Sequence, residues 1–519
     1  MQYLLAAAPI LVVLALMVYG RWGGQRAGPV GWVAALGVAA LAFGLTPEVL
    51  WVSQAKGVLL ALYVLAVLWP ALLLYNIIRH IGGVDALAQA LRLTIHDRGV
   101  LLLTVAWAFS GALEGLAGFG VPIAVVSPML VALGVAPVPA VAAVAVGHAW
   151  AVTFGDMGVI FQSLVAVAGM DAAELAWPAA LMLGAACVLC GLITAHILKQ
   201  AVGGLNLRRS TVIVVGVLMA FVQAVLASVG LTPLAALGAG LAGVVGGIVL
   251  GQNRLRQVKG SSDTQPTPTR AQISSAWPTL AAYGSLALLM TVLIGVPPVK
   301  AALDEVLWRA AFPEVGTLNG HVTPAGFGPA FRLFTHPGAS ILLVALISAL
   351  VYRRLGLMGA GGWVDVARAT GRAAVPASVG ILSMVGLSAL MEHAGMTWLL
   401  AQGLSALMER AFPLVSPFVG MLGAFATGSN INSNVLFGPM QKTIAQVLGV
   451  APALLLAAQT AGGSLGSMLA PAKLIVGCST VGLAGRDGEV LRITFPYGIL
   501  IALTLGLFVW LFSVLSRTV

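Results

Sequence analysis

The chain has 519 residues, of which 60% are hydrophobic and only 8% are charged, whereas about 25% of the residues in soluble domains are charged. This composition excludes a soluble globular protein, because no soluble core could bury so much apolar surface. The formal net charge is +10, but Lys and Arg gather in the short connections between apolar runs, which is typical of membrane topology and argues against nucleic-acid binding.

Apolar runs long enough to cross a bilayer recur along nearly the whole chain. A membrane-spanning helix needs about 20 mostly apolar residues, and these runs are continuous, whereas the strands of a membrane barrel would alternate over about 10 residues. The sequence therefore predicts an all-α polytopic membrane protein with about 12–14 membrane segments. Clear examples are Tyr3–Gly20, Gly57–Ile78, Leu175–Leu198, Thr211–Ser228, Trp277–Ile294 and Ile493–Leu515.

Basic clusters between the runs predict the orientation of the chain. Lys199–Arg209, Arg254–Arg270 and Arg353–Arg372 are separated from one another by even numbers of predicted spans. All three can therefore face the cytoplasm, as positively charged loops usually do. The same argument places the connection Arg79–Arg98 and the turn with Arg21 and Arg26 in the cytoplasm, and the segment 295–336 outside.

The runs and the clusters together divide the chain into six regions. The predicted linker is rich in Ser, Pro and charged residues, as flexible connections are. The regions are N-terminal peripheral helices at 1–56, a first membrane core at 57–200, a helical hairpin at 201–250, a cytoplasmic linker at 251–275, peripheral helices with the external segment at 276–375, and a second membrane core at 376–519.

The two cores carry an internal repeat. Residues 75–92 align without gaps on 388–405, so that His80 matches His393, and the pentapeptide LGVAP at 133–137 recurs at 448–452 with nearly the same spacing. The orientation argument places the two aligned segments on opposite sides of the membrane. Inverted repeats of this kind are a hallmark of secondary transporters, and the sequence contains no phosphate-binding loop for ATP-driven transport.

Each repeat also contains segments too rich in Gly, Pro and Ser for an unbroken span, at 112–130 and 147–158 and again at 427–441 and 461–474. Opened backbone leaves polar groups that lipid cannot satisfy, so we predict re-entrant hairpins or broken helices around a wet cavity. Helix N-termini in such a cavity suit a carboxylate substrate. The alternative is that the glycines only allow tight helix packing. The predicted substrate-binding residues are Gly118, Gly120, Thr427, Ser429, Asn430, Asn432, Asn434, Gln441 and Lys473.

Four of the ionisable residues lie in apolar surroundings, where such groups are expensive and usually functional. Glu114 is the predicted proton-coupling residue, with solvation at a helix end as the alternative. Asp156 and His148 are further candidates for proton coupling, although Asp156 could instead cap a helix and His148 could be a packing residue. Lys473 could neutralise a substrate carboxylate or extend to the membrane interface.

Three motifs resemble the lactate permease family of bacterial 2-hydroxymonocarboxylate symporters. They are LEG-x-AGFG-x-P at Leu113–Pro122, TGS-x-x-NSN-x-LFG-x-x-Q at Thr427–Gln441 and GG-x-x-G-x-M-x-x-P at Gly462–Pro471. The resemblance covers roughly 57–200 and 376–515. It implies proton-coupled uptake of lactate or glycolate across the bacterial inner membrane.

The chain departs from the family pattern at three places in the predicted site. Because all three lie where the substrate would bind, the substrate could differ even though the fold is kept. The departures are Asn430 and Ile431 where Asp-Thr is usual, Gly147 and His148 where Gly-Asn is usual, and Ala472 and Lys473 in place of a Gln.

The favoured hypothesis is a secondary symporter that carries a small organic anion inward with protons, embedded in membrane lipid and without a cofactor. A sodium-coupled carrier of another small organic anion is the alternative, because the Asn- and Ser-rich segment 427–434 could supply neutral oxygens to a cation. A membrane-embedded enzyme is disfavoured, since neither a metal-ligand motif nor a nucleophile–base arrangement is evident. A channel is disfavoured by the repeats, and a homodimer is left open.

Overall fold

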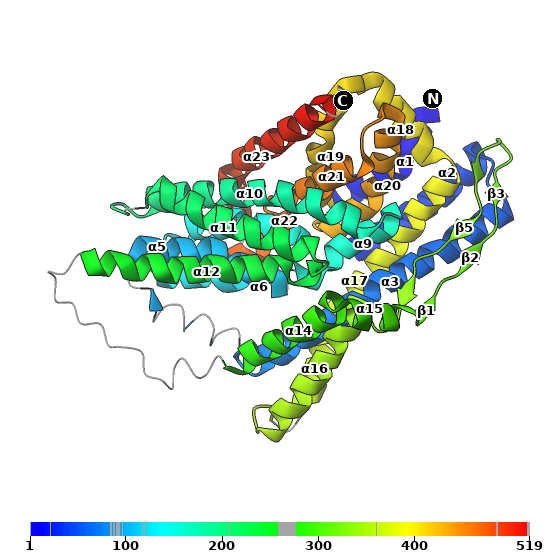
Figure 1. Cartoon of the computed structure of the whole chain (residues 1–519). Helices are drawn as coiled ribbons and strands as arrows, with labels where there is room; N and C mark the ends of the chain where they lie inside the picture. Colours follow the sequence, from blue (N-terminus) through cyan, green and yellow to red (C-terminus); the bar gives the residue numbers. More distant parts are fainter. Residues whose placement is uncertain are drawn as a thin grey trace.

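The computed structural model describes residues 2–515 except 21, 84–85, 87–88, 90–93, 96, 117, 119, 206, 258–276, 360 and 484–485. In this part of the chain nine helices are long and apolar enough to cross a membrane, and three shorter apolar helices accompany them (Figure 1). The predicted all-α polytopic fold is therefore confirmed. Most of the predicted linker, 258–275, lies outside the described residues.

Two long antiparallel helices, α3 (Pro47–His80) and α17 (Gly362–His393), form the spine of the molecule. Near one end of this pair, Gln54 Nε2 donates to the Gly386 carbonyl at 3.2 Å. Near the other end, Asn76 Nδ2 donates to Thr370 Oγ1, also at 3.2 Å. The region boundaries proposed at 56/57 and 375/376 fall inside these two continuous helices.

The ends of the spine helices show how the repeats are related. His80 and His393, which are equivalent in the repeat, terminate α3 and α17. Because the helices are antiparallel, these equivalent residues lie at opposite ends of the pair. Gly82 and Gly395 then turn the chain with φ angles of 70° and 79°, which glycine adopts without steric cost. The two repeats thus start from opposite ends of the molecule, and the predicted inversion is confirmed.

Each repeat consists of a re-entrant hairpin, a broken helix and a full crossing. In the first repeat, Arg98 donates to the Leu133 carbonyl at 3.3 Å, so the two open ends of the hairpin lie together. We call residues 98–132 hairpin 1. Its elements are α5 (Arg98–Leu103), the π-helical η1 (Thr104–Phe109), α6 (Ser110–Leu116) and α7 (Val121–Ala132). The broken helix consists of α8 (Pro137–His148), η2 (Ala149–Phe154), η3 (Asp156–Gly158) and α9 (Val159–Ala168). The full crossing is α10 (Ala172–Ala201).

The second repeat has the same order of elements. Ser416 donates to Gln441 Oε1 at 2.9 Å across its hairpin, which we call hairpin 2 (412–448). The LGVAP pentapeptides end in Pro137 and Pro452, and both prolines begin the broken helices at the position where proline is best tolerated. The elements are α18 (Met396–Met408), η4 (Glu409–Ala411), α19 (Phe412–Thr427), α20 (Asn430–Leu448), α21 (Pro452–Ser467), α22 (Pro471–Thr480) and α23 (Asp487–Leu515).

Two helices between the repeats, α11 (Arg209–Ser228) and α12 (Thr232–Gln257), brace hairpin 1. A Cβ atom on Gly240 of α12 would lie 2.4 Å from the Ala112 amide nitrogen, and one on Gly247 would lie 2.2 Å from Thr104 Oγ1. The small residues of α12 therefore let the backbones approach closely, as in other membrane helix pairs.

The remaining helices are peripheral, and the turn between the first two of them reaches hairpin 2. Gly24, after the turn between α1 (Gln2–Val18) and α2 (Gly24–Ala42), lies beside Asn432 and Gly380. Gly380 is about 27 Å along α17 from Gly362, so this turn lies far along α17 from the Arg353–Arg372 connection, and Arg26 is exposed there. The other peripheral helices are α14 (Trp277–Gly295), α15 (Pro297–Asp304) and α16 (Pro337–Arg354).

The predicted external segment forms a long β-hairpin along one side of the helices (Figure 1). Its tip is anchored on α2, where Asn319 Nδ2 donates to the Ala42 carbonyl at 3.1 Å. The sequence analysis did not foresee these strands. They are β1 (Leu307–Trp308), β2 (Ala311–Phe312), β3 (Val315–Gly316), β4 (Val322–Thr323), β5 (Gly326–Phe327) and β6 (Phe331–Arg332), paired β1 with β6, β2 with β5 and β3 with β4.

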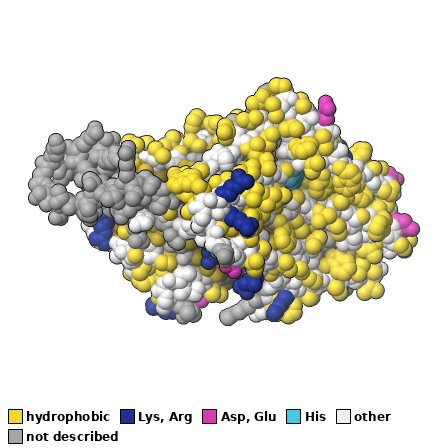
Figure 2. Space-filling model, turned by 90° about the horizontal axis from the view of Figure 1, so that it is seen from below, with side chains coloured by type: hydrophobic (Ala, Val, Ile, Leu, Met, Phe, Trp, Pro, Cys, Tyr) yellow, Lys and Arg dark blue, Asp and Glu magenta, His cyan; other side chains and the backbone are white. Residues whose placement is uncertain are grey.

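Charged side chains are distributed unevenly over the surface. Figure 2 shows a mainly hydrophobic face on which the visible Lys and Arg gather on one half, while most of the visible Asp and Glu lie toward the opposite edge. The Arg353–Arg372 connection lies beside the end of α3, since a Cβ on Gly362 would be 2.8 Å from His80 Nε2. Arg79 and this connection therefore share one end of the molecule, as expected for a cytoplasmic face.

Candidate functional site

The four interruptions of the two repeats meet in the centre of the molecule. The tip of hairpin 1 turns at Gly120 with a φ of 84°, and the tip of hairpin 2 turns at Gly428 with a φ of 68° before the extended residue Ser429. The broken helices are interrupted at 155–158 and between α21 and α22. Non-helical backbone is thus present at both predicted tips.

A cluster of four ionisable residues, which we call the charged cluster, lies where hairpin 1 meets the two broken helices. Glu114 on α6 is fully buried. Its Oε1 atom is 3.6 Å from Lys473 Nζ on α22, and its Oε2 atom is 4.0 Å from His148 Nε2 at the end of α8. Asp156 completes the cluster from the break itself. These are the four residues that the sequence analysis selected one by one.

Gly118 brings the two carboxylates together. Its amide donates to Asp156 Oδ1. A Cβ atom on Gly118 would lie 2.8 Å from Glu114 Oε1 and 2.7 Å from Asp156 Oδ2. Both carboxylates therefore approach the same point. The Asp156 carboxylate accepts a hydrogen bond from the tip of hairpin 1 and does not cap a helix, since α9 has no side-chain cap at its start.

The backbone of the break is strained where it presents Asp156. Asp156 and Met157 have φ angles of 50° and 55°, a region that non-glycine residues seldom occupy. Strain of this kind costs of the order of 1–3 kcal/mol per residue and is concentrated at functional sites.

The charges of the cluster do not balance. Glu114 and Asp156 carry two negative charges when both are ionised, whereas Lys473 supplies one positive charge and His148 supplies one only when protonated. An unbalanced charge at this depth costs several kcal/mol. Binding of a proton or of another cation therefore changes the energy of this site strongly.

A second, uncharged group of side chains lies at the tip of hairpin 2, and we call it the amide cluster. Asn430 Nδ2 is placed to donate to Thr153 Oγ1, the Thr460 carbonyl and Ser464 Oγ at 3.3, 3.2 and 3.4 Å. Asn434 Nδ2 donates to Thr460 Oγ1 at 3.0 Å. All five residues are buried.

Some buried acceptors in the two clusters receive no hydrogen bond from the described residues. They are Oδ1 of Asn430, Oδ1 of Asn434 and both carboxylate oxygens of Glu114. Buried polar atoms are normally paired, so these acceptors are the ones best placed to bind a proton, a cation or a hydroxyl group.

The 3₁₀ turns of the first broken helix connect the two clusters. Thr153 on η2 contacts Ser464 of the second repeat at 2.6 Å, and Asp156, only three residues later, contacts the tip of hairpin 1. A shift of this short segment would therefore be felt in both clusters.

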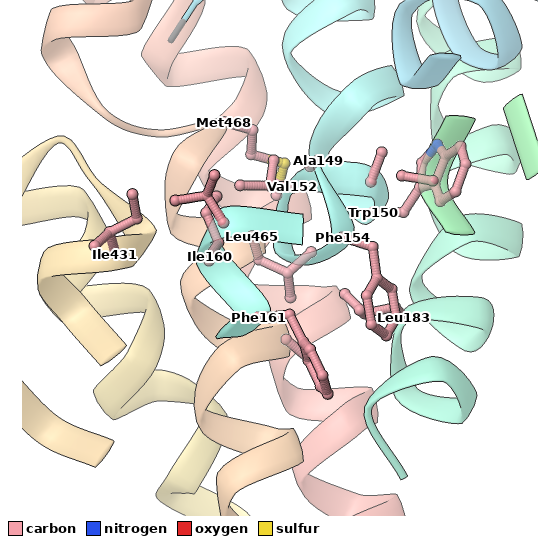
Figure 3. Close-up of a cluster of buried hydrophobic side chains, with 14 of the residues drawn as sticks. Ala149, Trp150, Val152, Phe154, Ile160, Phe161, Leu183, Ile431, Leu465 and Met468 are labelled. Atoms are coloured by element: carbon pink, nitrogen blue, oxygen red, sulfur yellow. The ribbon is translucent and has the colours of Figure 1, made fainter. Parts of the chain in front are cut away.

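Large apolar side chains surround the same break and exclude water from it. Trp150, Phe154 and Phe161 are fully buried, and the rings of Phe154 and Phe161 lie 5.1 Å apart. Figure 3 shows these side chains on one side of the break, toward α10, with Ile431 of α20 on the other side. Electrostatic interactions in the clusters are stronger in this dry setting than they would be in water.

The motif glycines of the second repeat have a packing role. A Cβ atom on Gly462 would lie 1.8 Å from the Pro417 carbonyl oxygen, and one on Gly463 would lie 1.8 Å from Asn430 Oδ1. These glycines let α21 press against hairpin 2. For them the alternative of tight helix packing is the better interpretation.

The structure does not place all predicted substrate-binding residues at the tips. Asn432 faces the turn between α1 and α2, where it lies close to Gly24. Gln441 is far along α20 and donates to Gln459 Oε1 at 3.2 Å. Ser429 does lie at the tip of hairpin 2, where it caps α20, and the side chain of Thr427 lies outside the described part of the chain.

Sequence analysis missed the hydroxyl partners of Asn430. Thr153 lies inside the segment 147–158 and Ser464 inside the motif Gly462–Pro471, so both segments were recognised as part of the site. Single Thr and Ser residues are common in membrane helices, and nothing in their spacing distinguishes these two. Only the fold brings them together.

Comparisons with known proteins found a family and several relatives that this chain resembles. The model of the L-lactate permease family matches residues 2–516. The chain is 27% identical over 540 residues to the L-lactate permease of Bacillus subtilis (strain 168), which covers 96% of this chain and 94% of the relative. It is 25% identical to the glycolate permease GlcA of Escherichia coli (strain K12), covering 97% of this chain and 94% of the relative. It is also similar to the solved YdaH transporter of Alcanivorax borkumensis, with a TM-score of 0.48, 18% identity and coverage of 86% of this chain and 84% of that one.

Proposed function

Because the chain belongs to the L-lactate permease family and is a multi-pass membrane transporter of small hydroxy acids rather than an enzyme, we propose that it imports lactate or glycolate together with protons across the bacterial inner membrane. The observation that carries the proposal is the buried contact of Glu114 with Lys473 at 3.6 Å, which joins a carboxylate of the first repeat to a cation of the second. The names of the relatives support the substrate class.

The substrate would bind between the two clusters. A 2-hydroxymonocarboxylate has a carboxylate, which needs donors, and a hydroxyl group, which can donate. Lys473 is a partly buried donor close to the start of α22, and a helix start favours a negative charge. The Oδ1 atoms of Asn430 and Asn434 would accept from the hydroxyl. This set of donors and acceptors matches a small hydroxy acid better than an acid without a hydroxyl group.

Glu114 would couple the proton to the substrate. A substrate carboxylate that binds Lys473 competes with Glu114 for the same ammonium group, because this group contacts Glu114 in the structure. Once it loses the ammonium, Glu114 is buried beside Asp156 without a counter-charge, and protonation removes that penalty. One bound proton would therefore accompany each substrate molecule.

Sodium coupling is the second candidate, and the amide cluster favours it. Asn430 and Asn434 carry acceptor oxygens without donors among the described residues, and the Thr460 carbonyl and the Thr153 hydroxyl lie beside them. Neutral oxygens at broken helices coordinate Na⁺ in several transporter folds. In this alternative the cation is bound by the second repeat.

Uptake into proteoliposomes tests both candidates. The purified protein is reconstituted, and an inward proton gradient (acidic outside) or an inward sodium gradient is imposed. Labelled lactate, glycolate, propionate or acetate is supplied outside. We expect uphill accumulation of lactate or glycolate with the pH gradient, and little uptake of the acids without a hydroxyl group. Accumulation driven only by sodium would favour the second candidate, and failure to transport any hydroxy acid would contradict the proposed function.

A further inference from the structure

A large cavity lies on the side of the molecule away from the Arg353–Arg372 connection. Its volume is about 610 Å³, and it is lined by the ends of α9 and α20, by α3 and α17, and by the β-hairpin. Four basic side chains and two carboxylates line it. The basic residues are Lys56, Arg309, Arg332 and Lys442, and the acidic residues are Asp171 and Glu392.

The acidic residues do not cancel the positive charge of this cavity. Asp171 Oδ1 accepts from the Ala173 amide at 2.9 Å, so it caps α10, where the helix start already attracts it. Arg332 is 3.6 Å from Asp304 outside the cavity. Lys56, Arg309 and Lys442 then face Glu392, which leaves an excess of positive charge over a small volume.

The β-hairpin holds one of these cations over the cavity. The guanidinium group of Arg309 lies 5.3 Å from the centre of the Phe327 ring across the hairpin, a cation–π contact that fixes its position. Lys442 is fixed from the opposite side, because its Nζ donates to the Ala168 carbonyl at 2.6 Å. Two further N–H groups of this ammonium can still bind an anion.

Buried polar side chains of α20, and one of α21, lie between the candidate site and the cavity. Asn430 and Asn434 lie in the amide cluster at the start of this helix. Further along, Gln459 donates to Ser433 Oγ at 3.0 Å, and Gln441 donates to Gln459 Oε1 at 3.2 Å. The next residue is Lys442 at the cavity wall. Buried polar groups of α20 and Gln459 of α21 thus lie in the part of the molecule between the site and the cavity.

We infer that this cavity is an external recruitment site for the small carboxylate substrate, in which Lys56, Arg309 and Lys442 hold the anion before it reaches the two clusters. The inference rests on the proposed function for the class of ligand. A positively charged concave surface raises the local concentration of an anion and its rate of association, and salt screens this effect.

The test measures initial rates of lactate uptake by Arg309→Gln, Lys56→Gln and the double variant at low and high ionic strength. We expect KM to rise about threefold in each single variant and about tenfold in the double variant at low ionic strength, with an unchanged maximal rate. The dependence of KM on salt should become weaker in the same order. Arg309→Lys keeps the positive charge, so its KM and its salt dependence should stay close to those of the parent protein.

Arg354→Gln is the matched control, because it removes an equal charge from an exposed position at the far end of α16. Each variant is reconstituted once in zwitterionic lipid alone and once with anionic lipid. Unchanged KM and salt dependence in variants that still transport would overturn the recruitment site and leave the proposed function intact. A change seen only with anionic lipid would assign the basic residues to lipid binding and also overturn it. No uptake by the parent protein would instead contradict the proposed function itself.

Discussion

The two repeats share one architecture but bring different chemistry to the centre of the molecule. Hairpin 1 and its broken helix contribute Glu114, His148 and Asp156, all ionisable and buried. Hairpin 2 and its broken helix contribute neutral amides and hydroxyls around Asn430, and one cation, Lys473. The two repeats therefore have the same backbone arrangement, but their side chains at the centre differ. Those of the first repeat are ionisable, and those of the second are mostly neutral.

The difference in side-chain chemistry favours different functions for the two repeats. Buried ionisable groups respond to protons, whereas neutral amides and hydroxyls respond to the shape and the hydrogen-bonding groups of a ligand. Under the proposed function, the first repeat would therefore couple the proton and the second would recognise the substrate. Lys473 is the exception, because it crosses from the second repeat into the charged cluster, and this contact would let each half sense the other.

The largest effect should come from Glu114→Gln, which mimics the protonated form permanently. We expect it to abolish uphill accumulation driven by a pH gradient, because the site can no longer release a proton. Counterflow exchange of labelled for unlabelled lactate should remain measurable in the same proteoliposomes. Glu48→Gln, at an exposed position in the first turn of α3, serves as the control. Accumulation equal to that of the parent protein would move the coupling role to Asp156 or His148.

A substitution in the amide cluster of the second repeat should have an intermediate effect on transport. Asn430→Ala removes three hydrogen-bond contacts from the amide cluster, and we expect about a tenfold rise in the KM for lactate, equivalent to about 1.4 kcal/mol. Asn432→Ala, two residues away and facing the α1–α2 turn, should change KM by less than about twofold. Equal effects of the two substitutions on KM would contradict the amide cluster as the recognition site.

A smaller effect should come from Asp156→Asn. The amide oxygen can still accept from the Gly118 amide, so the tip of hairpin 1 keeps its contact. Removal of one carboxylate leaves the Glu114 charge balanced by Lys473, which makes proton uptake by Glu114 less favourable without abolishing it. We expect uphill accumulation to fall by about threefold, and the variant should retain coupling to the pH gradient. A loss as complete as that of Glu114→Gln would show that the two carboxylates act as one unit.

Much of this fold could be predicted from the sequence, because lipid imposes simple rules on it. Continuous apolar runs marked the spans, and the LGVAP pentapeptides marked equivalent starts of α8 and α21. The glycine-rich segments were recognised as hairpins or broken helices, and each repeat contains one of each. Glu114, Asp156, His148 and Lys473 stood out because an ionisable residue in an apolar run is rare.

The remainder depended on contacts between distant segments. The pairing of Glu114 with Lys473 joins α6 to α22, and the contact of Thr153 with Ser464 joins the two broken helices; no local pattern encodes either. The β-hairpin was missed because its paired stretches are only two residues long.

The central claim, that the first repeat carries the proton and the second carries the substrate, can be tested by calorimetry. Lactate binding to the purified protein is measured in buffers of different ionisation enthalpy, which gives the number of protons taken up per bound substrate. The account predicts about one proton for the parent protein and for Asn430→Ala, and none for Glu114→Gln. Uptake of the same number of protons by Glu114→Gln as by the parent protein would contradict it.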